Sequence, residues 1–354
     1  MSIDRSSILK PISEPVVMDG VYSEDQHRRL LEVARREGPW SLILAQHFKS
    51  PEEVIATLSG KLPEGVTPTM DMFLTPCFRG HFAEGGVCLH DDIADTFYNQ
   101  TFLNHAKAYW GAQYAHPTMM LFNIQGACHS EDPGHLDGVS FRGISYDNTP
   151  VWLLNIMGKS GLFTHYLRKM AQVITWYYQG AEGGGFTYWP QGPKAQPKRL
   201  SAPMWNKGVV VQNEMMYHRG EANGPQELRR PQGLALNSLF GADPDVADGW
   251  QITTEGQVIQ KVPASEMRFL VHWNGEVFMD MADLRRTLDQ KDDLTHEQVF
   301  DTFLKDLRAK GVEVATPSDP MSDKAFIGTL VANYDIGVPE LYPAEAPGPR
   351  QLAA

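Results

Sequence analysis

The sequence has few cysteines, no strongly basic segment and no long apolar run, and each absence excludes a class of protein. Its 354 residues include three cysteines (Cys77, Cys88 and Cys128). An odd number without metal-binding spacing argues against a disulfide framework. The chain has 31 Lys and Arg against 43 Asp and Glu, giving a net charge of −12, which disfavours binding to nucleic acid or anionic membranes. No apolar stretch reaches transmembrane length, and the first residues lack the apolar segment of a signal peptide. These absences predict a cytoplasmic protein.

Sequence motifs of several common enzyme classes are also missing. No GxGxxG or Walker-type loop marks a nucleotide site, and no GxSxG elbow marks a serine nucleophile. The glycines at 183–185 precede no helical pattern, so they do not predict a phosphate-binding loop. The remaining candidate chemistry is that of a metal ion.

The pattern of hydrophobic residues divides the chain into three regions of one integrated domain. Residues 1–114 carry helix signals, among them capping patterns that begin at Ser23 and Ser50, and predict a helical N-terminal flank. Residues 115–280 contain short β-branched and aromatic runs separated by Gly and Pro turns, which is typical of a sandwich, jelly roll or barrel. Residues 281–354 predict C-terminal helices and a loose tail rich in Pro and Ala. The predicted fold class is mainly β with flanking helices.

Three His-x-Asp/Glu pairs could supply metal ligands. On an extended chain, residues i and i+2 face the same side, so such a pair offers an imidazole and a carboxylate to one ion. Chance alone gives about 1.5 such pairs at this composition, so the context must decide between them. His90-x-Asp92 opens a helical segment, and His129-x-Glu131 lies in a polar loop. His135-x-Asp137 lies where the strand-rich region begins, and we predict that this pair binds the metal.

A third ligand from a later strand would complete a facial triad with open coordination positions. The candidates are His165, His218 and His272. His165 lies in a less regular segment, and His272 is better explained as a core or pocket-lining imidazole. His218 ends the strand-like run GVVVQNEMMYH, as expected of a strand that returns beside the first, and is the predicted third ligand.

With His135-x-Asp137 and a distant His218 on a strand-rich frame, residues 115–280 resemble the iron(II)- and 2-oxoglutarate-dependent oxygenases. Within that superfamily the chain looks closest to the phytanoyl-CoA-dioxygenase-like group. The resemblance implies a double-stranded β-helix core (a cupin-like jelly roll), with Fe(II), O2 and 2-oxoglutarate as cofactors and cosubstrates. It also implies an enzyme that hydroxylates or desaturates a C–H bond of a small molecule while 2-oxoglutarate is decarboxylated to succinate. Halogenating relatives have a small residue where Asp137 stands, so oxygenation is expected here.

The resemblance further implies an arginine, on the core strand after the distal histidine, that binds the far carboxylate of 2-oxoglutarate. Arg268 begins the alternating run Arg-Phe-Leu-Val-His-Trp and is the favoured residue. Arg230 is the alternative: together with Arg229 it has the more usual spacing after His218, but Pro231 follows it directly. A hairpin-like insertion, QITTEGQVIQKV, would explain the long separation between His218 and Arg268.

Several alternatives stay open at this point. Arg142 and Lys159 either contact an anionic substrate or lie on the surface, and an aromatic cluster either lines a substrate pocket or forms sheet core (Trp176, Tyr177, Tyr178, Phe186, Tyr188 and Trp189). The same three ligands would also serve a cupin-like hydrolase or isomerase without 2-oxoglutarate. A non-catalytic β-sandwich binding protein is the third interpretation. Neither the substrate nor the oligomeric state follows from the sequence.

Overall fold

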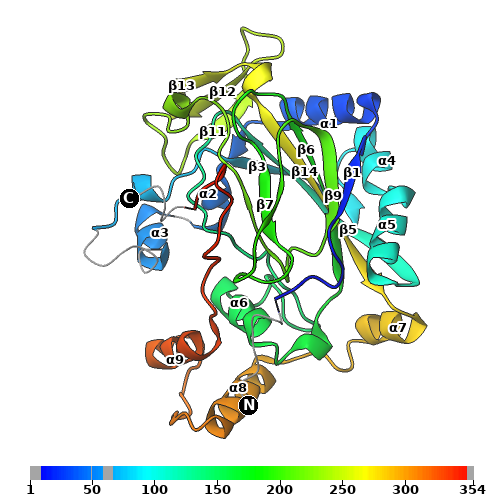
Figure 1. Ribbon diagram of the computed structural model, residues 1–354, viewed down its shortest axis with the longest axis vertical. Coiled ribbons are helices and arrows are strands. Elements are labelled where there is room, and N and C mark those ends of the chain that lie inside the picture. Colours follow the sequence, from blue (N-terminus) through cyan, green and yellow to red (C-terminus); the bar gives the residue numbers. More distant parts are fainter. Residues whose placement is uncertain (1–8, 49, 59–66, 349–354) are drawn as a thin grey trace.

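A seven-stranded antiparallel sheet forms the centre of the molecule (Figure 1). The structure is a computed structural model and describes residues 9–48, 50–58 and 67–348. The strands of this large sheet lie in the order β1-β9-β6-β14-β5-β3-β4. In chain order they are β1 (Val16–Asp19), β3 (Phe78–Glu84), β4 (Val87–Cys88), β5 (Tyr114–Gln125), β6 (Met170–Tyr178), β9 (Met204–Val211) and β14 (Arg268–Phe278).

A smaller antiparallel sheet belongs to the same core. Its order is β10-β7-β8, with β7 (Phe186–Trp189), β8 (Lys198–Leu200) and β10 (Tyr217–Gly220). The irregular segment 128–135 adds a fourth strand, because Cys128 bridges Asn223 and His135 bridges His218. Along the chain the strands alternate between the two sheets. The order is β5 (large sheet), 128–135 (small), β6 (large), β7 and β8 (small), β9 (large), β10 (small) and β14 (large). Eight strands distributed in this way between two sheets form a double-stranded β-helix, a jelly roll, which confirms the predicted fold class.

A third sheet lies in the chain segment between β10 and β14. It has the order β13-β12-β11-β2, with β2 (Trp40–Ser41), β11 (Leu239–Ala242), β12 (Trp250–Thr254) and β13 (Gln257–Val262). The hairpin predicted from QITTEGQVIQKV is β12–β13. Its turn residues Glu255 and Gly256 have φ values of +51° and +79°, as a tight hairpin turn requires. The insertion therefore separates His218 from Arg268 in sequence while the core strands remain neighbours in space.

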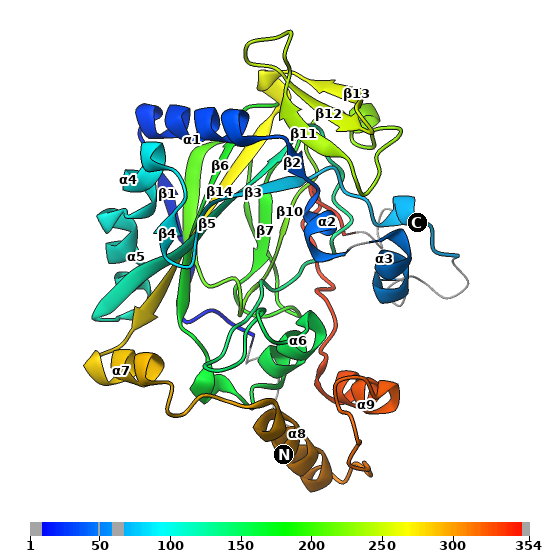
Figure 2. The same cartoon turned by 180° about the vertical axis from the view of Figure 1, so that it is seen from behind.

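Helices cover the outer face of the large sheet and one end of the core (Figures 1 and 2). α5 contacts β5, β6 and β14, and Trp273 of β14 donates a hydrogen bond from Nε1 to the Phe97 carbonyl at 2.8 Å. Among the described residues, none of the helices combines the length and apolar character needed to span a bilayer. The helices are α1 (Glu24–Glu37), α2 (Ile43–His47), α3 (Pro51–Leu58), α4 (Ala94–Phe97), α5 (Gln100–Trp110), α6 (Val151–Ser160), α7 (Met281–Asp289), α8 (His296–Ala309) and α9 (Lys324–Tyr334).

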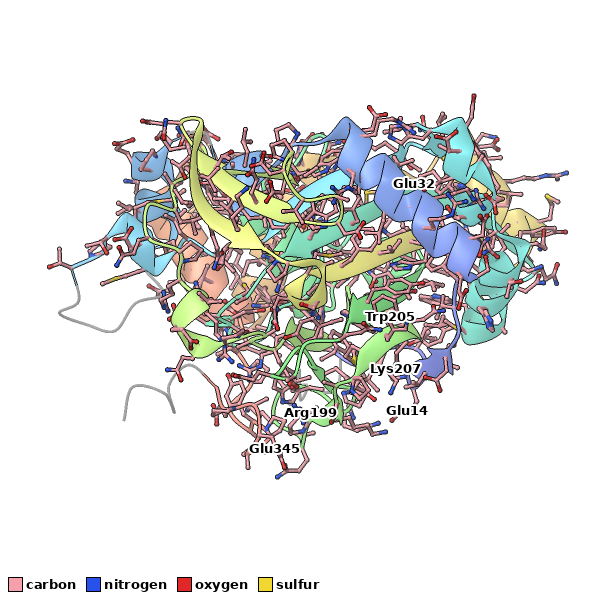
Figure 3. All side chains as sticks on the ribbon, turned by 90° about the horizontal axis from the view of Figure 1, so that it is seen from above. Glu14, Glu32, Arg199, Trp205, Lys207 and Glu345 are labelled. Carbon is pink, nitrogen blue, oxygen red and sulfur yellow. The ribbon has the colours of Figure 1, made fainter. Side chains whose placement is uncertain are left out.

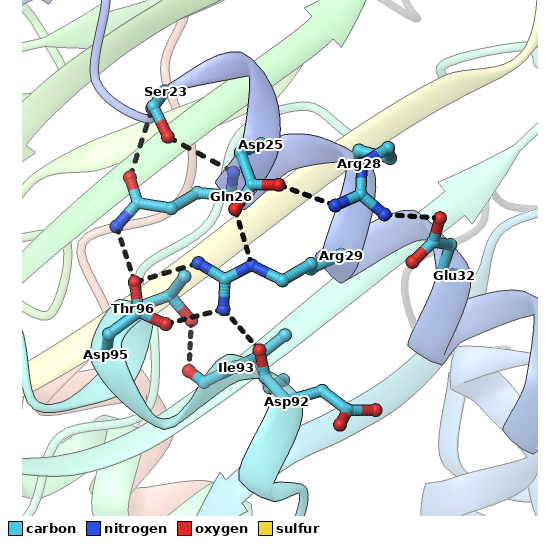
Figure 4. A network of polar contacts seen from close by, with 10 residues as sticks. All are labelled: Ser23, Asp25, Gln26, Arg28, Arg29, Glu32, Asp92, Ile93, Asp95 and Thr96. Atoms are coloured by element: carbon cyan, nitrogen blue, oxygen red, sulfur yellow. Dashed lines mark hydrogen bonds and ion pairs between the residues drawn. The ribbon is translucent and has the colours of Figure 1, made fainter.

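The start of α1 is fixed by a capping box and by ion pairs (Figure 4). Ser23 and Gln26 each accept a hydrogen bond from the other's backbone N–H, as the sequence pattern predicts. Arg29 pairs with Asp25 of the same helix at 2.9 Å and with Asp95 of α4 at 2.6 Å. These contacts hold α1 against α4, although exposed ion pairs of this kind each contribute little to stability.

The N-terminal flank differs from the all-helical segment predicted for residues 1–114. β1 pairs with β9 and β3 pairs with β5, so both strands widen the large sheet beyond the eight-stranded core. Within this flank, residues 94–110 form two helices, α4 and α5, because the Asn99 side chain accepts hydrogen bonds from the backbone N–H groups of Thr101 and Phe102 and starts a new helix.

The C-terminal tail is also more ordered than predicted. The expectation of a loose tail is wrong for residues 343–348, while 349–354 lie outside the described residues. Arg219 of β10 donates hydrogen bonds to the carbonyls of Ala346 and Pro347, and Tyr342 donates to the Pro133 carbonyl at 2.9 Å. Figure 3 shows Glu345 beside Arg199 of β8. The tail therefore packs on the small sheet, next to the segment that carries His135.

Replacing Trp273 tests the packing between the large sheet and its helices. Trp273 is fully buried and stacks edge-on against Phe102. Trp273→Ala should lower the free energy of unfolding by about 3–5 kcal/mol, because it leaves a large cavity and an unpaired Phe97 carbonyl. Leu288→Ala, at a side chain that is 71% exposed, is the control and should change it little. Chemical denaturation of both variants measures the difference, and equal values would contradict this account of the core.

Candidate metal centre

The three predicted ligands meet where segment 128–135 pairs with β10. His135 and His218 exchange both backbone hydrogen bonds, each at 3.0 Å, and so form a hydrogen-bonded antiparallel pair. Their rings lie on the same side, with centroids 4.4 Å apart. The Asp137 N–H donates to the Asn213 carbonyl at 3.1 Å, which fixes the carboxylate beside both rings.

The side chains of this cluster form a suitable site for a divalent transition metal. Asp137 Oδ1 lies 3.8 Å from His135 Nε2 and 3.5 Å from His218 Nε2. One ligand atom from each residue lies within 4.8 Å of the other two. Two imidazoles and one carboxylate on one side of an ion are the donor set of facial-triad iron(II) sites, and they leave positions open for other ligands. His218 is buried while the His135 side chain is 50% exposed, so the cluster is open to solvent on one side.

Each imidazole is oriented through its second nitrogen. His135 Nδ1 lies 2.5 Å from Asp132 Oδ2, and His218 Nδ1 lies 3.0 Å from the Met216 carbonyl. When Nδ1 carries the proton in both rings, Nε2 is free to bind a metal. Asp132 is a functional residue that the sequence analysis missed. Asp132 lies three residues before His135, in a turn that includes Pro133 and Gly134. Only the structure shows that this turn brings the Asp132 carboxylate to His135.

Gln172 of β6 orients the carboxylate ligand. Its Nε2 donates to Asp137 Oδ2 at 3.0 Å and to Glu214 Oε1 at 3.2 Å. Asp137 Oδ1 is thereby left to face the two imidazoles. The sequence analysis missed Gln172 as well. Side chains alternate along β6, so Gln172 shares a face with Ile174 and Trp176. Its contact with Asp137 across the core becomes apparent only in the fold.

The charges of the cluster fit a site that a cation can occupy. Burial opposes ionisation of Asp137, but the charge and hydrogen bond of His218 outweigh it and hold the pKa of Asp137 well below its usual range. Burial lowers the pKa of His135, but the carboxylates of Asp132 and Asp137 overcome this effect and raise it to about 9. A bound metal ion would replace these imidazole protons. Burial, reinforced by the charge of Asp137, raises the pKa of Glu214 to about 8, so this neighbour is mostly protonated at pH 7.

The competing histidines do not join the cluster. His165 lies in a short helical turn and stacks edge-on with Tyr166, 5.3 Å between ring centroids. His272 of β14 is close enough to Asp137 for their charges to interact, but no ligand atom of it lies within the cluster. Burial lowers the pKa of His272 to about 4, and its Nε2 has no hydrogen-bond partner among the described residues. His272 therefore lines the site as a neutral ring.

The two candidate arginines for the cosubstrate lie in different surroundings. Arg268 is 5% exposed at the start of β14, and its Nε and Nη2 have no hydrogen-bond partner within the described ranges. Arg230 lies in the insertion, is 53% exposed and pairs with Glu131. A buried guanidinium without a partner is costly, whereas an exposed pair is ordinary. Of the two arginines, only Arg268 is therefore buried with guanidinium donors left unpaired among the described residues.

The other polar candidates have structural partners. Arg142 is buried and forms two hydrogen bonds with Asp292, at 3.0 and 2.9 Å. Lys159 pairs with Asp335 at 2.6 Å. The aromatic residues singled out in the sequence are buried in the hydrophobic cores that line both sheets (Trp176, Tyr177, Tyr178, Phe186, Tyr188 and Trp189). Their packing agrees with the sheet-core alternative.

Comparison with protein-family models gives no match, and neither does comparison with curated protein sequences. Solved structures with a similar architecture include an oxidoreductase of the 2OG-Fe(II) oxygenase family from Burkholderia pseudomallei (14% identity, covering 72% of this chain and 91% of that one, TM-score 0.29). A collagen prolyl hydroxylase from Paramecium bursaria Chlorella virus-1 is similar at 10% identity (75% and 97% covered, TM-score 0.35). A Pseudomonas putida prolyl-4-hydroxylase is similar at 9% identity (75% and 92% covered, TM-score 0.31). Because these TM-scores are below 0.5, the fold assignment depends on the strand order and not on these similarities.

The orienting role of Asp132 can be tested by metal binding. Asp132→Asn should weaken binding of Mn(II) or Fe(II) by roughly 10- to 100-fold, because the neutral amide no longer fixes the proton on His135 Nδ1. Anaerobic competition titration against a chelator measures the change. Asp301→Asn, at an exposed position on α8, is the control and should bind metal as the unmodified protein does. An unchanged affinity in Asp132→Asn would show that His135 needs no such support.

Proposed function

We propose that this protein is a non-haem iron(II)- and 2-oxoglutarate-dependent oxygenase that hydroxylates, or desaturates, a C–H bond of a small-molecule substrate. The observation that carries this proposal is the buried, unpartnered guanidinium of Arg268 on the face of the large sheet that is turned toward the His135–Asp137–His218 cluster. The cluster accounts for the metal, and Arg268 accounts for an anionic cosubstrate.

The register of the large sheet places Arg268 toward the metal centre. Arg268, Leu270 and His272 alternate along β14 and share one face. His272 lies near enough to Asp137 for each group to affect the pKa of the other, so this face is the one turned to the cluster. A ligand with two carboxylates, one at the metal and one at Arg268, would give the guanidinium the counter-charge that it lacks.

The nearest carboxylate around Arg268 already has other partners. Glu221 is near enough for its charge to raise the pKa of Arg268, although burial lowers that pKa overall. Glu221 accepts two hydrogen bonds from Arg199, both at 2.7 Å, and another from Thr187 at 2.7 Å. The Arg268 guanidinium is therefore left for a ligand, and its planar fork matches a carboxylate.

The residues of the site have separate tasks in this chemistry. His135, Asp137 and His218 would hold iron(II), which supplies oxygen activation coupled to decarboxylation of 2-oxoglutarate. Asp132 and the Met216 carbonyl hold the two imidazoles, and Gln172 holds the carboxylate. Phe186, buried with its ring centroid 5.7 Å from that of His218, and Trp176, which packs on Phe186, exclude water from the inner side of the centre.

Further properties belong to the proposal as expectations. They are membership of the phytanoyl-CoA-dioxygenase-like group, a cytoplasmic location and a small-molecule partner instead of nucleic acid or membrane. The proposal is tested by adding iron(II) and 2-oxoglutarate without oxygen. A metal-to-ligand charge-transfer band is expected, and its absence in a protein that still binds iron would favour a cupin-like enzyme that does not use 2-oxoglutarate.

Removing any one ligand should abolish function, because the three ligands act as a unit. His135→Ala, Asp137→Ala and His218→Ala should each lose tight iron binding and 2-oxoglutarate-dependent succinate formation, with circular dichroism unchanged. His165→Ala is the control, since His165 lies outside the cluster, and it should keep both properties. Loss of succinate formation in the control together with its retention in His218→Ala would mean that the third ligand is misassigned.

Arg268 and Arg230 can be separated by titration with 2-oxoglutarate. Arg268→Ala should raise the half-saturating 2-oxoglutarate concentration by roughly 100-fold or more, because one carboxylate would then be buried without a cation. Iron affinity should stay nearly the same. Arg268→Lys should restore only part of the loss, since an ammonium cannot form two parallel hydrogen bonds.

Arg230→Ala is the matched control for this titration and should saturate normally. A large shift in Arg230→Ala with none in Arg268→Ala would show that the usual sequence spacing identifies the cosubstrate residue better than burial does.

A further inference from the structure

A second, partly buried cation faces the metal centre from β3, the strand that widens the large sheet beyond its core. Arg79 lies opposite Asn123 of β5, and Asn123 lies opposite Leu270 of β14. Arg79 Nε donates a hydrogen bond to Asn123 Oδ1 at 2.9 Å. Arg79 therefore shares the sheet face of Arg268, but it lies on the far side of β5.

The surroundings of Arg79 are those of the metal site. The Arg79 guanidinium is near enough to His135 and His272 to oppose their protonation, although it is a minor influence on both, and Asp137 and Tyr146 are near enough to act on it in return. Tyr146 packs directly on Gly138, the residue that follows Asp137. A Cβ placed on Gly138 would lie 1.8 Å from Tyr146 Oη. Tyr146 is 48% exposed. Arg79 thus lies near both the metal centre and a tyrosine at the solvent boundary.

The guanidinium of Arg79 has no anionic partner within the described ranges of the chain. Asn123 is neutral and occupies only Nε, which leaves both Nη groups as donors. Asp137 is engaged by His218 and Gln172. The acid of the same strand, Glu84, lies 3.5 Å from His81. Burial lowers the pKa of Arg79, so the protein bears the cost of holding a charge there.

The balance of charges indicates what ligand would compensate this cation. In the proposed enzyme, the charges of iron(II), Asp137, doubly charged 2-oxoglutarate and Arg268 sum to zero. Asp132 adds one negative charge beside His135, and Arg219, whose charge interacts with that of Asp132, cancels it. Arg79 then remains as one positive charge. A carboxylate brings one negative charge, whereas a phosphate monoester brings about −1.5 to −2 at pH 7 and would leave an excess. The free Nη edge can also donate two parallel hydrogen bonds to a planar carboxylate.

We propose that Arg79 binds the carboxylate of the substrate, so that the protein acts on small monocarboxylic acids whose reacting C–H bond is held at the metal centre. This inference rests on the proposed oxygenase function. It gives β3 a role beyond widening the sheet: this strand supplies the substrate anchor, as β14 supplies the cosubstrate anchor.

The test uses monocarboxylic acids of four to ten carbons, straight-chain or ending in a phenyl ring, each paired with its primary amide. In the first arm, the compounds are added without oxygen to the protein loaded with iron(II) and 2-oxoglutarate, and changes in the charge-transfer band report binding. In the second arm, thermal shifts of the metal-free protein report binding of the same compounds.

The unmodified protein should bind at least one acid roughly tenfold or more tightly than its amide, as expected for hydrogen bonds to a charged group. Arg79→Gln should lose this preference, and Arg79→Lys should keep part of it. Both variants should titrate normally with 2-oxoglutarate. Arg28→Gln, at an exposed arginine of α1, is the control and should keep the preference in full.

Three results would overturn the inference: no acid of the set binds, acids and amides bind equally, or Arg79→Gln keeps the preference. A raised 2-oxoglutarate requirement in Arg79→Gln would also overturn it, because Arg79 would then serve the cosubstrate. If the unmodified protein forms no charge-transfer band, the proposed function fails by itself. The thermal shifts of the metal-free protein still decide the role of Arg79 in that case. Should Arg79→Gln not fold, Arg79→Lys carries the comparison.

Discussion

The metal centre depends on one antiparallel backbone pair, His135 with His218. Because these two residues exchange both backbone hydrogen bonds, their side chains must emerge on the same side at close separation. Asp137 follows two residues later and is tied to Asn213 by its own N–H. The cluster is therefore a consequence of strand pairing between 128–135 and β10.

The segments around this pair make it rigid. Arg219, next to His218, binds the backbone of the C-terminal tail, and Tyr342 of that tail binds the Pro133 carbonyl. Asp132, from the same turn, contacts His135. Segment 128–135, which carries His135, is not regularly paired along its whole length. The C-terminal residues 342–347, more than a hundred residues later in the chain, support it from outside. Orientation of ligands by surrounding groups is what gives such centres their metal affinity.

Buried positive charge distinguishes the interior of this jelly roll from an ordinary sheet core. Arg142, Arg199 and Arg219 have carboxylate or carbonyl partners. Arg268 and Arg79 have no carboxylate partner among the described residues, and both lie on the sheet face turned to the metal centre. Folding has to bear the desolvation of the buried Arg268 and the partly buried Arg79, and an anionic ligand would offset this cost. The two arginines lie on opposite sides of β5, so two anions could be bound there without meeting.

The sequence by itself determined the strand-rich core, the hairpin of the insertion, the capping box of α1 and the choice of His135, Asp137 and His218. These features follow from local rules: a period of two along strands, turn residues between them, and side chains i and i+2 on one face. Only the tertiary structure decided which arginine is buried, because Arg230 and Arg268 differ in their surroundings and not in their type. It also revealed Asp132, Gln172 and Arg79, which reach the centre from a turn and from two other strands. Their roles depend on strand order and register, and these are set by long-range pairing that local sequence does not encode.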